Sequence, residues 1–221
     1  MTGGAQDLIF EVEGAEGAAD GTPVVVLLHG RGADRHDLRG LAPHLPQDTV
    51  LVTPQAPHAG GPWGYGPGWA WYRYVAEDRV VPETLPDSLD RLERFMGALP
   101  DRVGFQPGPV VLGGFSQGGT TSLAYALTHP QAVSGVAVLS GFLVDAPGVV
   151  PVTAEPLEQV PVFWGHGLYD PAIPHALGAR GRLRLEGLGV QLETFDQPMG
   201  HQVSLQELEA LRTWMEGLRG A

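Results

Sequence analysis

One serine stands between glycines in the stretch GGFSQGG, where an apolar run rich in valine changes into a helix-forming run. Glycine tolerates backbone angles that other residues avoid, so the chain can turn sharply here and a helix can approach the strand closely. The pattern G-x-S-x-G is typical of a nucleophilic serine at such a turn. The alternative is a tight loop in which Ser116 only caps the following helix.

A nucleophilic serine needs a base, usually a histidine that is oriented by a carboxylate. Of the eight histidines we favour His201, which follows the last expected strand and precedes a capped terminal helix. The loop after the preceding strand supplies Asp170 as the acid. Asp196 is the rival acid because it is closer in sequence to His201, but it lies at a strand end. The order Ser116, Asp170, His201 is that of serine, acid and histidine in α/β-hydrolases.

Acyl transfer also needs hydrogen-bond donors for the negative charge that develops on the carbonyl oxygen. The backbone N–H of Gln117 is one candidate, because it begins the helix after Ser116, where free amides and the helix dipole favour negative charge. The backbone N–H of Arg31 is the other, in the turn HGRGAD after the first parallel strand. An ordinary strand-to-helix turn is the alternative interpretation of HGRGAD.

Short apolar runs that alternate with helical patterns would position these residues. The runs cover residues 23–30, 49–57, 108–116, 133–141, 160–167 and 189–195. Near-continuous apolar strands between helices predict the α/β class, with a mostly parallel central sheet and helices on both faces. Residues 7–14 predict an antiparallel edge strand, and apolar spacings of three and four predict helices over 86–103 and 204–218. We expect one domain over residues 1–221, since no linker is visible.

The composition excludes several kinds of chemistry. The chain has no cysteine and no lysine, so a thiolate nucleophile, a disulfide and a Schiff base are unavailable. A net charge of −12 argues against binding to nucleic acids or to anionic lipids. We expect a cytoplasmic protein without membrane insertion, because no signal peptide or spanning segment is visible. The stretch DRHD at 34–37 lacks the spacing of a metal site, so no metal is expected.

Four stretches in order, LLHGRGAD, GFSQGG, HGLYDPAIP and GHQVS, closely resemble the phospholipase/carboxylesterase family of α/β-hydrolases over nearly the whole chain. The family includes bacterial carboxylesterases and acyl-protein thioesterases. The resemblance implies a triad of Ser116, Asp170 and His201, an oxyanion hole from the amides of Arg31 and Gln117, and hydrolysis of esters or thioesters without a cofactor. Thioesterase members usually carry leucine where this chain has Arg31.

The longest irregular stretch, residues 54–86, is rich in aromatic side chains, with Trp63, Tyr65, Trp69, Trp71, Tyr72 and Tyr74. The family resemblance places this stretch near the rim of the active site. We expect about half of these rings to pack the loop against the domain. The others should line the substrate pocket, with Trp71 as the first choice, and a crowded wall would favour compact substrates.

We therefore expect a serine carboxylesterase that hydrolyses small-molecule esters through an acyl-enzyme. The alternative is an acyl-protein thioesterase or lysophospholipase that acts on long acyl chains. A second alternative is a protein of the hydrolase fold that binds a ligand without turnover. The oligomeric state is left open, with a homodimer among the alternatives.

Overall fold

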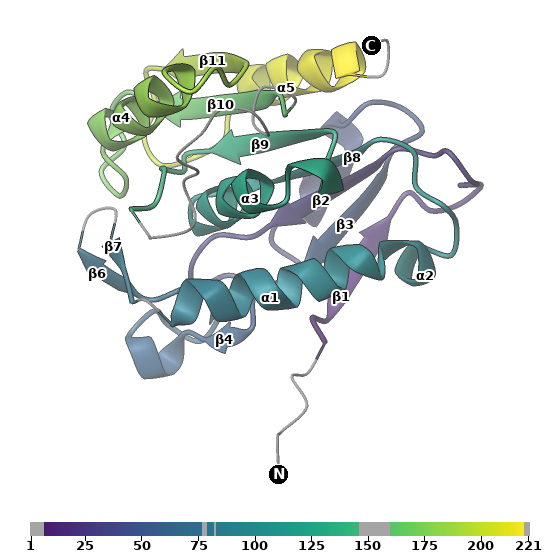
Figure 1. Ribbon diagram of the computed structural model, residues 1–221, viewed down its shortest axis with the longest axis horizontal. Helices are drawn as coiled ribbons and strands as arrows, with labels where there is room; N and C mark the ends of the chain where they lie inside the picture. Colours follow the sequence, from purple (N-terminus) through teal and green to yellow (C-terminus); the bar gives the residue numbers. More distant parts are fainter. Residues whose placement is uncertain (1–6, 77–78, 82, 146–159, 219–221) are drawn as a thin grey trace.

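The computed structural model describes residues 7–76, 79–81, 83–145 and 160–218. Within these ranges one seven-stranded sheet crosses the molecule in the order β1-β3-β2-β8-β9-β10-β11 (Figure 1). Its strands are β1 Phe10–Glu13, β2 Val24–Leu28, β3 Val50–Pro54, β8 Val110–Phe115, β9 Gly135–Leu139, β10 Val162–Gly167 and β11 Leu192–Gln197. Strand β1 pairs antiparallel with β3, and every other pair is parallel. The predicted parallel sheet with an antiparallel N-terminal edge strand is confirmed.

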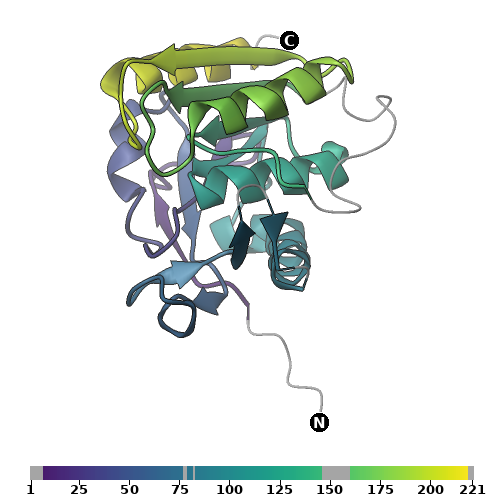
Figure 2. The ribbon, with the colours of Figure 1, turned by 90° about the vertical axis from the view of Figure 1, so that its left-hand side faces the viewer.

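Helices cover both faces of this sheet (Figures 1 and 2). They are α1 Thr84–Gly97, α2 Leu99–Val103, α3 Gln117–Thr128, α4 His175–Glu186 and α5 Leu205–Leu218, with short 3₁₀ turns at Arg39–His44, Gly61–Trp63 and Pro130–Ala132. Within β2, Val24 and Val26 join the apolar cluster of α1, α3 and α4, whereas Val25 and Leu27 join that of α5. Successive side chains of a strand point to opposite faces, so the two clusters lie on the two sides of the sheet.

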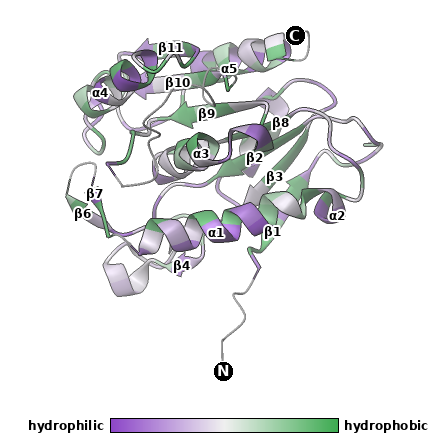
Figure 3. Cartoon of the chain, viewed as in Figure 1, coloured by the Kyte–Doolittle hydropathy of each residue, from purple (hydrophilic) through white to green (hydrophobic). Residues whose placement is uncertain are grey.

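The central strands are mostly apolar, and green predominates on several of them in the hydropathy colours of Figure 3. Every residue of β2, β3, β9 and β10 is buried. A strand that is covered by helices on both faces has no solvent side for polar residues, which explains the valine-rich runs. The carboxyl ends of these parallel strands therefore form one edge, and the loops that leave it lie side by side.

The predicted helix over 86–103 is interrupted. Helix α1 ends at Gly97 and α2 begins at Leu99. Pro100 has no backbone N–H, so the hydrogen bond that it would donate in a continuous helix is missing. Helix α5 spans Leu205–Leu218 and agrees with the predicted range to one residue at its start.

The aromatic stretch that was expected to be irregular contains small antiparallel pairs. Strand β4 (His58–Ala59) pairs with β5 (Trp69–Ala70), and β6 (Tyr74–Ala76) pairs with β7 (Arg79–Val80). Residues 77, 78 and 82 of this stretch lie outside the described ranges. None of the helices in the described ranges combines the length and hydropathy that a membrane span requires.

Candidate active site

Ser116 sits in a strained turn between β8 and α3. Its φ of 55° lies in a region that residues with a side chain rarely adopt. A Cβ on Gly114 or on Gly118 would overlap the carbonyl oxygen of Leu28, so the neighbouring strand leaves room only for glycine at both positions. Neither glycine has a positive φ. The glycines of GGFSQGG therefore allow a close approach to β2, and the strained angle falls on the serine itself.

The structure brings Ser116, His201 and Asp170 together from three separate loops. His201 Nε2 lies 2.9 Å from Ser116 Oγ, and His201 Nδ1 lies 2.7 Å from Asp170 Oδ2. A carboxylate only accepts hydrogen bonds, so Nδ1 donates its proton to Asp170. Nε2 of the neutral ring is then free to accept the hydroxyl hydrogen of Ser116. The arrangement is that of a nucleophile, a general base and an orienting acid.

The carboxyl group of Asp170 is enclosed in the protein and hydrogen-bonded there. Its side chain has no exposed surface, and its Oδ1 accepts the backbone N–H groups of Ala172 and Ile173, both at 2.8 Å. Hydrogen bonds to an ionised acceptor are stronger than neutral ones and compensate for its loss of water. The rival acid Asp196 lies elsewhere, because its carboxylate accepts hydrogen bonds from His175 and Arg182.

His166 was not singled out from the sequence, although it is the first residue of the HGLYD stretch. Its side chain is fully buried in β10, and Nε2 donates to the carbonyl of Ile173 at 2.9 Å. The same nitrogen lies 3.6 Å from Asp170 Oδ2. Burial lowers the pKa of His166, which favours the neutral ring. His166 thus supports the loop that presents Asp170, and the buried polar residue in an apolar strand was the signal for it.

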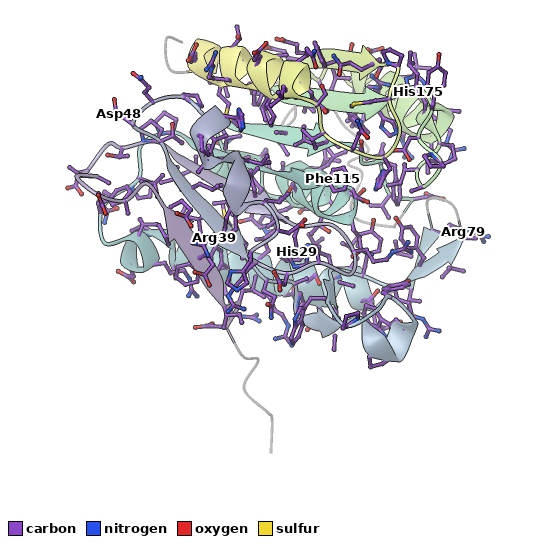
Figure 4. The ribbon with its side chains drawn as sticks, turned by 180° about the vertical axis from the view of Figure 1, so that it is seen from behind. His29, Arg39, Asp48, Arg79, Phe115 and His175 are labelled. Atoms are coloured by element: carbon purple, nitrogen blue, oxygen red, sulfur yellow. The ribbon has the colours of Figure 1, made fainter. Side chains whose placement is uncertain are left out.

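The turn that carries Arg31 lies against Ser116. A Cβ added to Gly30 would stand 3.6 Å from the Cβ of Ser116. Figure 4 labels His29 and Phe115, which precede this turn and the serine, near the middle of the molecule. Gln117 begins α3, where the backbone amides of the first turn point away from the helix. Both predicted oxyanion donors therefore belong to segments that border the serine.

Trp71 lies behind these donors and not in a pocket wall, which differs from the prediction. The residue is fully buried, its backbone N–H donates to Gln117 Oε1 at 2.8 Å, and its indole N–H donates to the carbonyl of His29 at 3.0 Å. Gln117 Nε2 donates to the carbonyl of Tyr72 at 2.7 Å. A tryptophan has an indole N–H that needs a partner when buried. Its partner here is the backbone next to Gly30, so Trp71 joins the aromatic stretch to the Arg31 turn.

A cavity of about 450 Å³ opens at Ser116. Its described lining consists of Arg31, Tyr74, Ala76, Ser116, Phe142, Ala172, Ile173, Pro174, Ala176, Leu177 and Arg180. The aromatic stretch contributes Tyr74 to this wall, and the ring of Tyr74 stacks on Phe142 with centroids 6.0 Å apart. The volume is within the range of small-molecule sites, and most of the lining is apolar.

Comparisons with known proteins identify a family and a fold for this chain. A sequence model of the family described as Phospholipase/Carboxylesterase matches residues 10–218. Acyl-protein thioesterase 1 of Cryptococcus neoformans var. neoformans is 28% identical over 90% of this chain and 93% of its own. A probable inactive carboxylesterase of Oryza sativa subsp. japonica is 32% identical over 93% of this chain and 88% of its own. The crystal structure of esterase PE8 has a TM-score of 0.79 at 26% identity, covering 96% of this chain and 100% of its own.

Proposed function

We propose a serine-esterase mechanism for this chain, which belongs to the phospholipase/carboxylesterase family of α/β-hydrolases. The observation that carries the proposal is the unbroken series of hydrogen bonds from Ser116 through His201 to the buried carboxylate of Asp170. Such a series activates a hydroxyl that is otherwise a weak nucleophile at neutral pH.

In the first half-reaction, His201 Nε2 takes the hydroxyl proton while Ser116 Oγ attacks the ester carbonyl carbon. The carbonyl oxygen becomes an oxyanion that accepts hydrogen bonds from the backbone N–H groups of Arg31 and Gln117. Asp170 stabilises the imidazolium that forms. His201 then gives its proton to the leaving alcohol, the ester C–O bond breaks, and an acyl-enzyme remains.

In the second half-reaction, water replaces the alcohol. His201 takes one proton from the water, whose oxygen attacks the acyl carbon, and the same two amides stabilise the second oxyanion. The bond to Ser116 Oγ breaks as Oγ regains the proton from His201. The carboxylic acid leaves, and the triad returns to its first state without any cofactor.

Small carboxylic esters are the substrates that this cavity supports best. About 450 Å³ accommodates a compact acyl and alcohol group, and Tyr74, stacked on Phe142, forms a stiff wall beside Ser116. An acyl-protein thioesterase or lysophospholipase is the second candidate, favoured by the relative named acyl-protein thioesterase 1. Ligand binding without turnover is the third, because the rice relative is named a probable inactive carboxylesterase. The assembled triad argues against this third function.

Two measurements test the proposal. A fluorophosphonate probe should label the wild type and Ser134→Ala, which changes an exposed serine on the loop before β9, but should not label Ser116→Ala. Rates over a 4-nitrophenyl ester series from acetyl to palmitoyl, with a thioester included, should be highest for the short acyl chains. Hydrolysis by Ser116→Ala at the wild-type rate would refute the serine mechanism. A higher kcat/KM for palmitoyl esters or for the thioester would favour the second candidate.

A further inference from the structure

Arg31 presents a fixed positive charge to the cavity that contains Ser116. Its guanidinium carbon lies 4.7 Å from the centroid of the Tyr65 ring and 5.4 Å from that of Tyr74. Tyr65 in turn accepts the backbone N–H of Tyr74 with its hydroxyl at 2.9 Å, and the Tyr74 ring stacks on Phe142. Aromatic faces attract a guanidinium and restrict its rotamers. The cation is therefore oriented before any substrate binds.

The backbone below Arg31 is equally constrained. The N–H of Gly32 donates to the carbonyl of Trp69 at 2.8 Å, and the N–H of Trp69 donates to the carbonyl of Ala33 at 2.8 Å. Gly32 has a φ of +82°, and a Cβ there would stand 2.7 Å from the carbonyl oxygen of Tyr65. Glycine is required at this position. A loop that is already ordered loses little entropy when a ligand binds.

The charged side chains in the lining of the cavity are basic. Its described lining contains two arginines, Arg31 and Arg180, and no aspartate or glutamate. Several arginines elsewhere face a carboxylate within 4.0 Å, such as Arg35 with Glu11 and Arg182 with Asp196. Arg31 has no such partner among residues 7–76, 79–81, 83–145 and 160–218. In a chain with a net charge of −12, an arginine in a cavity lining without a carboxylate partner among the described residues is a local exception.

We propose that the Arg31 side chain binds an anionic group of the substrate, so that the protein prefers esters that carry a carboxylate over neutral esters of the same shape. The proposal rests on the ester hydrolysis proposed above and narrows its substrate class. A guanidinium offers forked donors that match a carboxylate. Since the backbone of the same residue borders Ser116, the carboxylate must lie within one arginine side-chain length of the reacting carbonyl. Small monoesters of dicarboxylic acids and esters of short hydroxy acids meet this condition.

The overall negative charge does not oppose this preference strongly. Exposed charges more than about 8 Å away are largely screened at physiological ionic strength. A carboxylate in direct contact with Arg31 lies well within this screening distance and keeps its attraction to the guanidinium. The charge of Arg31 therefore determines which ester is preferred. The distant carboxylates of the protein mainly lower the rate at which an anionic ester reaches the cavity.

Two pairs of isosteric esters test the proposal, each with a carboxylate in one member and a carboxamide in the other. Monoethyl glutarate and ethyl glutaramate place the group on the acyl side. The pair 3-acetoxybenzoate and 3-acetoxybenzamide places it on the alcohol side. In at least one pair the wild type should have a kcat/KM about tenfold higher for the anionic member, the effect of one charge-assisted hydrogen bond.

Variants at Arg31 show whether this residue is the cause. Arg31→Met keeps an unbranched side chain and should reduce the ratio of anionic to neutral kcat/KM to about one, whereas Arg31→Lys should retain part of it. Arg212→Met makes the same change of net charge at an exposed position on α5 and should retain the wild-type ratio. The ratio is the readout because the Arg31 amide also serves the reaction.

Each outcome has a distinct meaning. If the wild type hydrolyses the neutral esters in a Ser116-dependent way but shows no anionic preference in either pair, the inference is wrong and the proposed function stands. An anionic preference that persists in Arg31→Met also overturns the role of Arg31. Absence of turnover on all four esters overturns both the inference and the preference for small esters.

Discussion

On one side of Ser116, His201 and Asp170 meet through side-chain hydrogen bonds of 2.9 and 2.7 Å, whereas the other side consists of the backbone turns of Arg31 and Gln117. The first side depends on which ionisable groups are present. The second depends on where the chain holds its amides, and neutral groups such as Trp71 hold them there. A substitution should therefore change the chemistry on the first side and the geometry or stability on the second.

The largest effect is expected on the acid–base side. Asp170→Asn should lower kcat by about 10⁴-fold, because an amide in place of the carboxylate favours the wrong tautomer of His201. Asp196→Asn is the matched control, since its carboxylate contacts His175 and Arg182 instead of His201. Steady-state kinetics on a short ester would compare the two variants. A loss of activity confined to Asp196→Asn would show that the wrong acid has been chosen.

The two sides also differ in how much of them could be predicted from the sequence. Ser116, Asp170 and His201 follow from residue type, chain order and placement after strands, because their chemistry belongs to their side chains. On the other side, the backbone amides of Arg31 and Gln117 are held in place by tertiary contacts, which the sequence does not show. The sequence alone does not indicate that the indole N–H of Trp71 donates to the carbonyl of His29, or that the ring therefore stays out of the pocket wall.

The fold was predictable for a similar reason. Apolar runs report burial on both faces of a strand, and they placed every strand of the parallel sheet. The small pairs β4–β5 and β6–β7 were missed because short strands rich in glycine and aromatic residues have no clear alternation. Such short strand pairs are stabilised by tertiary contacts, which the local pattern of apolar and polar residues does not reveal.

A buried carboxyl on the helix after the His201 loop should make the stability of the fold fall as pH rises towards neutrality. Glu207, on the helix after the His201 loop, is fully buried, and burial raises its pKa to about 7 from an ordinary value of 4.5. The folded state then binds more protons than the unfolded state between these pH values, so stability falls as pH rises through this window. The difference corresponds to roughly 3 kcal/mol.

Urea unfolding of Glu207→Gln from pH 4.5 to pH 8 would measure this contribution. The free energy of unfolding of the wild type should fall relative to the variant by roughly 3 kcal/mol over the window. Glu209→Gln, at an exposed position on the same helix, should follow the wild type. Parallel curves for the wild type and Glu207→Gln would show that Glu207 does not titrate in this range.

The opposite side should respond to acid. His29 is buried, its Nε2 accepts the N–H of Ala56 at 3.0 Å, and burial lowers its pKa to about 4 from an ordinary value of 6.5. The unfolded state binds more protons between these values, so the stability supplied by neutral His29 is lost as pH falls from 6.5 towards 4. The loss again corresponds to roughly 3 kcal/mol.

The matching experiment follows His29→Gln from pH 7 to pH 4. The wild type should lose stability relative to this variant as pH falls, the reverse of the slope expected for Glu207. His44→Gln changes a half-buried histidine in the first 3₁₀ turn and should keep the wild-type slope. If the variant His29→Gln loses stability with acid as steeply as the wild type, His29 is not the group responsible.

The smallest effect is expected at Trp71, and it separates a scaffold residue from a pocket wall. Trp71→Phe keeps most of the buried ring but removes the N–H that binds the carbonyl of His29, so the free energy of unfolding should fall by about 1–2 kcal/mol. Trp63→Phe, at a half-buried position of the same stretch, is the matched control and should lower the free energy of unfolding by less.

The acyl-chain preference should stay the same in Trp71→Phe and shift towards longer chains in Tyr74→Ala, because Tyr74 lines the cavity. Should the preference shift in Trp71→Phe but not in Tyr74→Ala, Trp71 would return to the pocket wall and the supporting role assigned to it would be wrong.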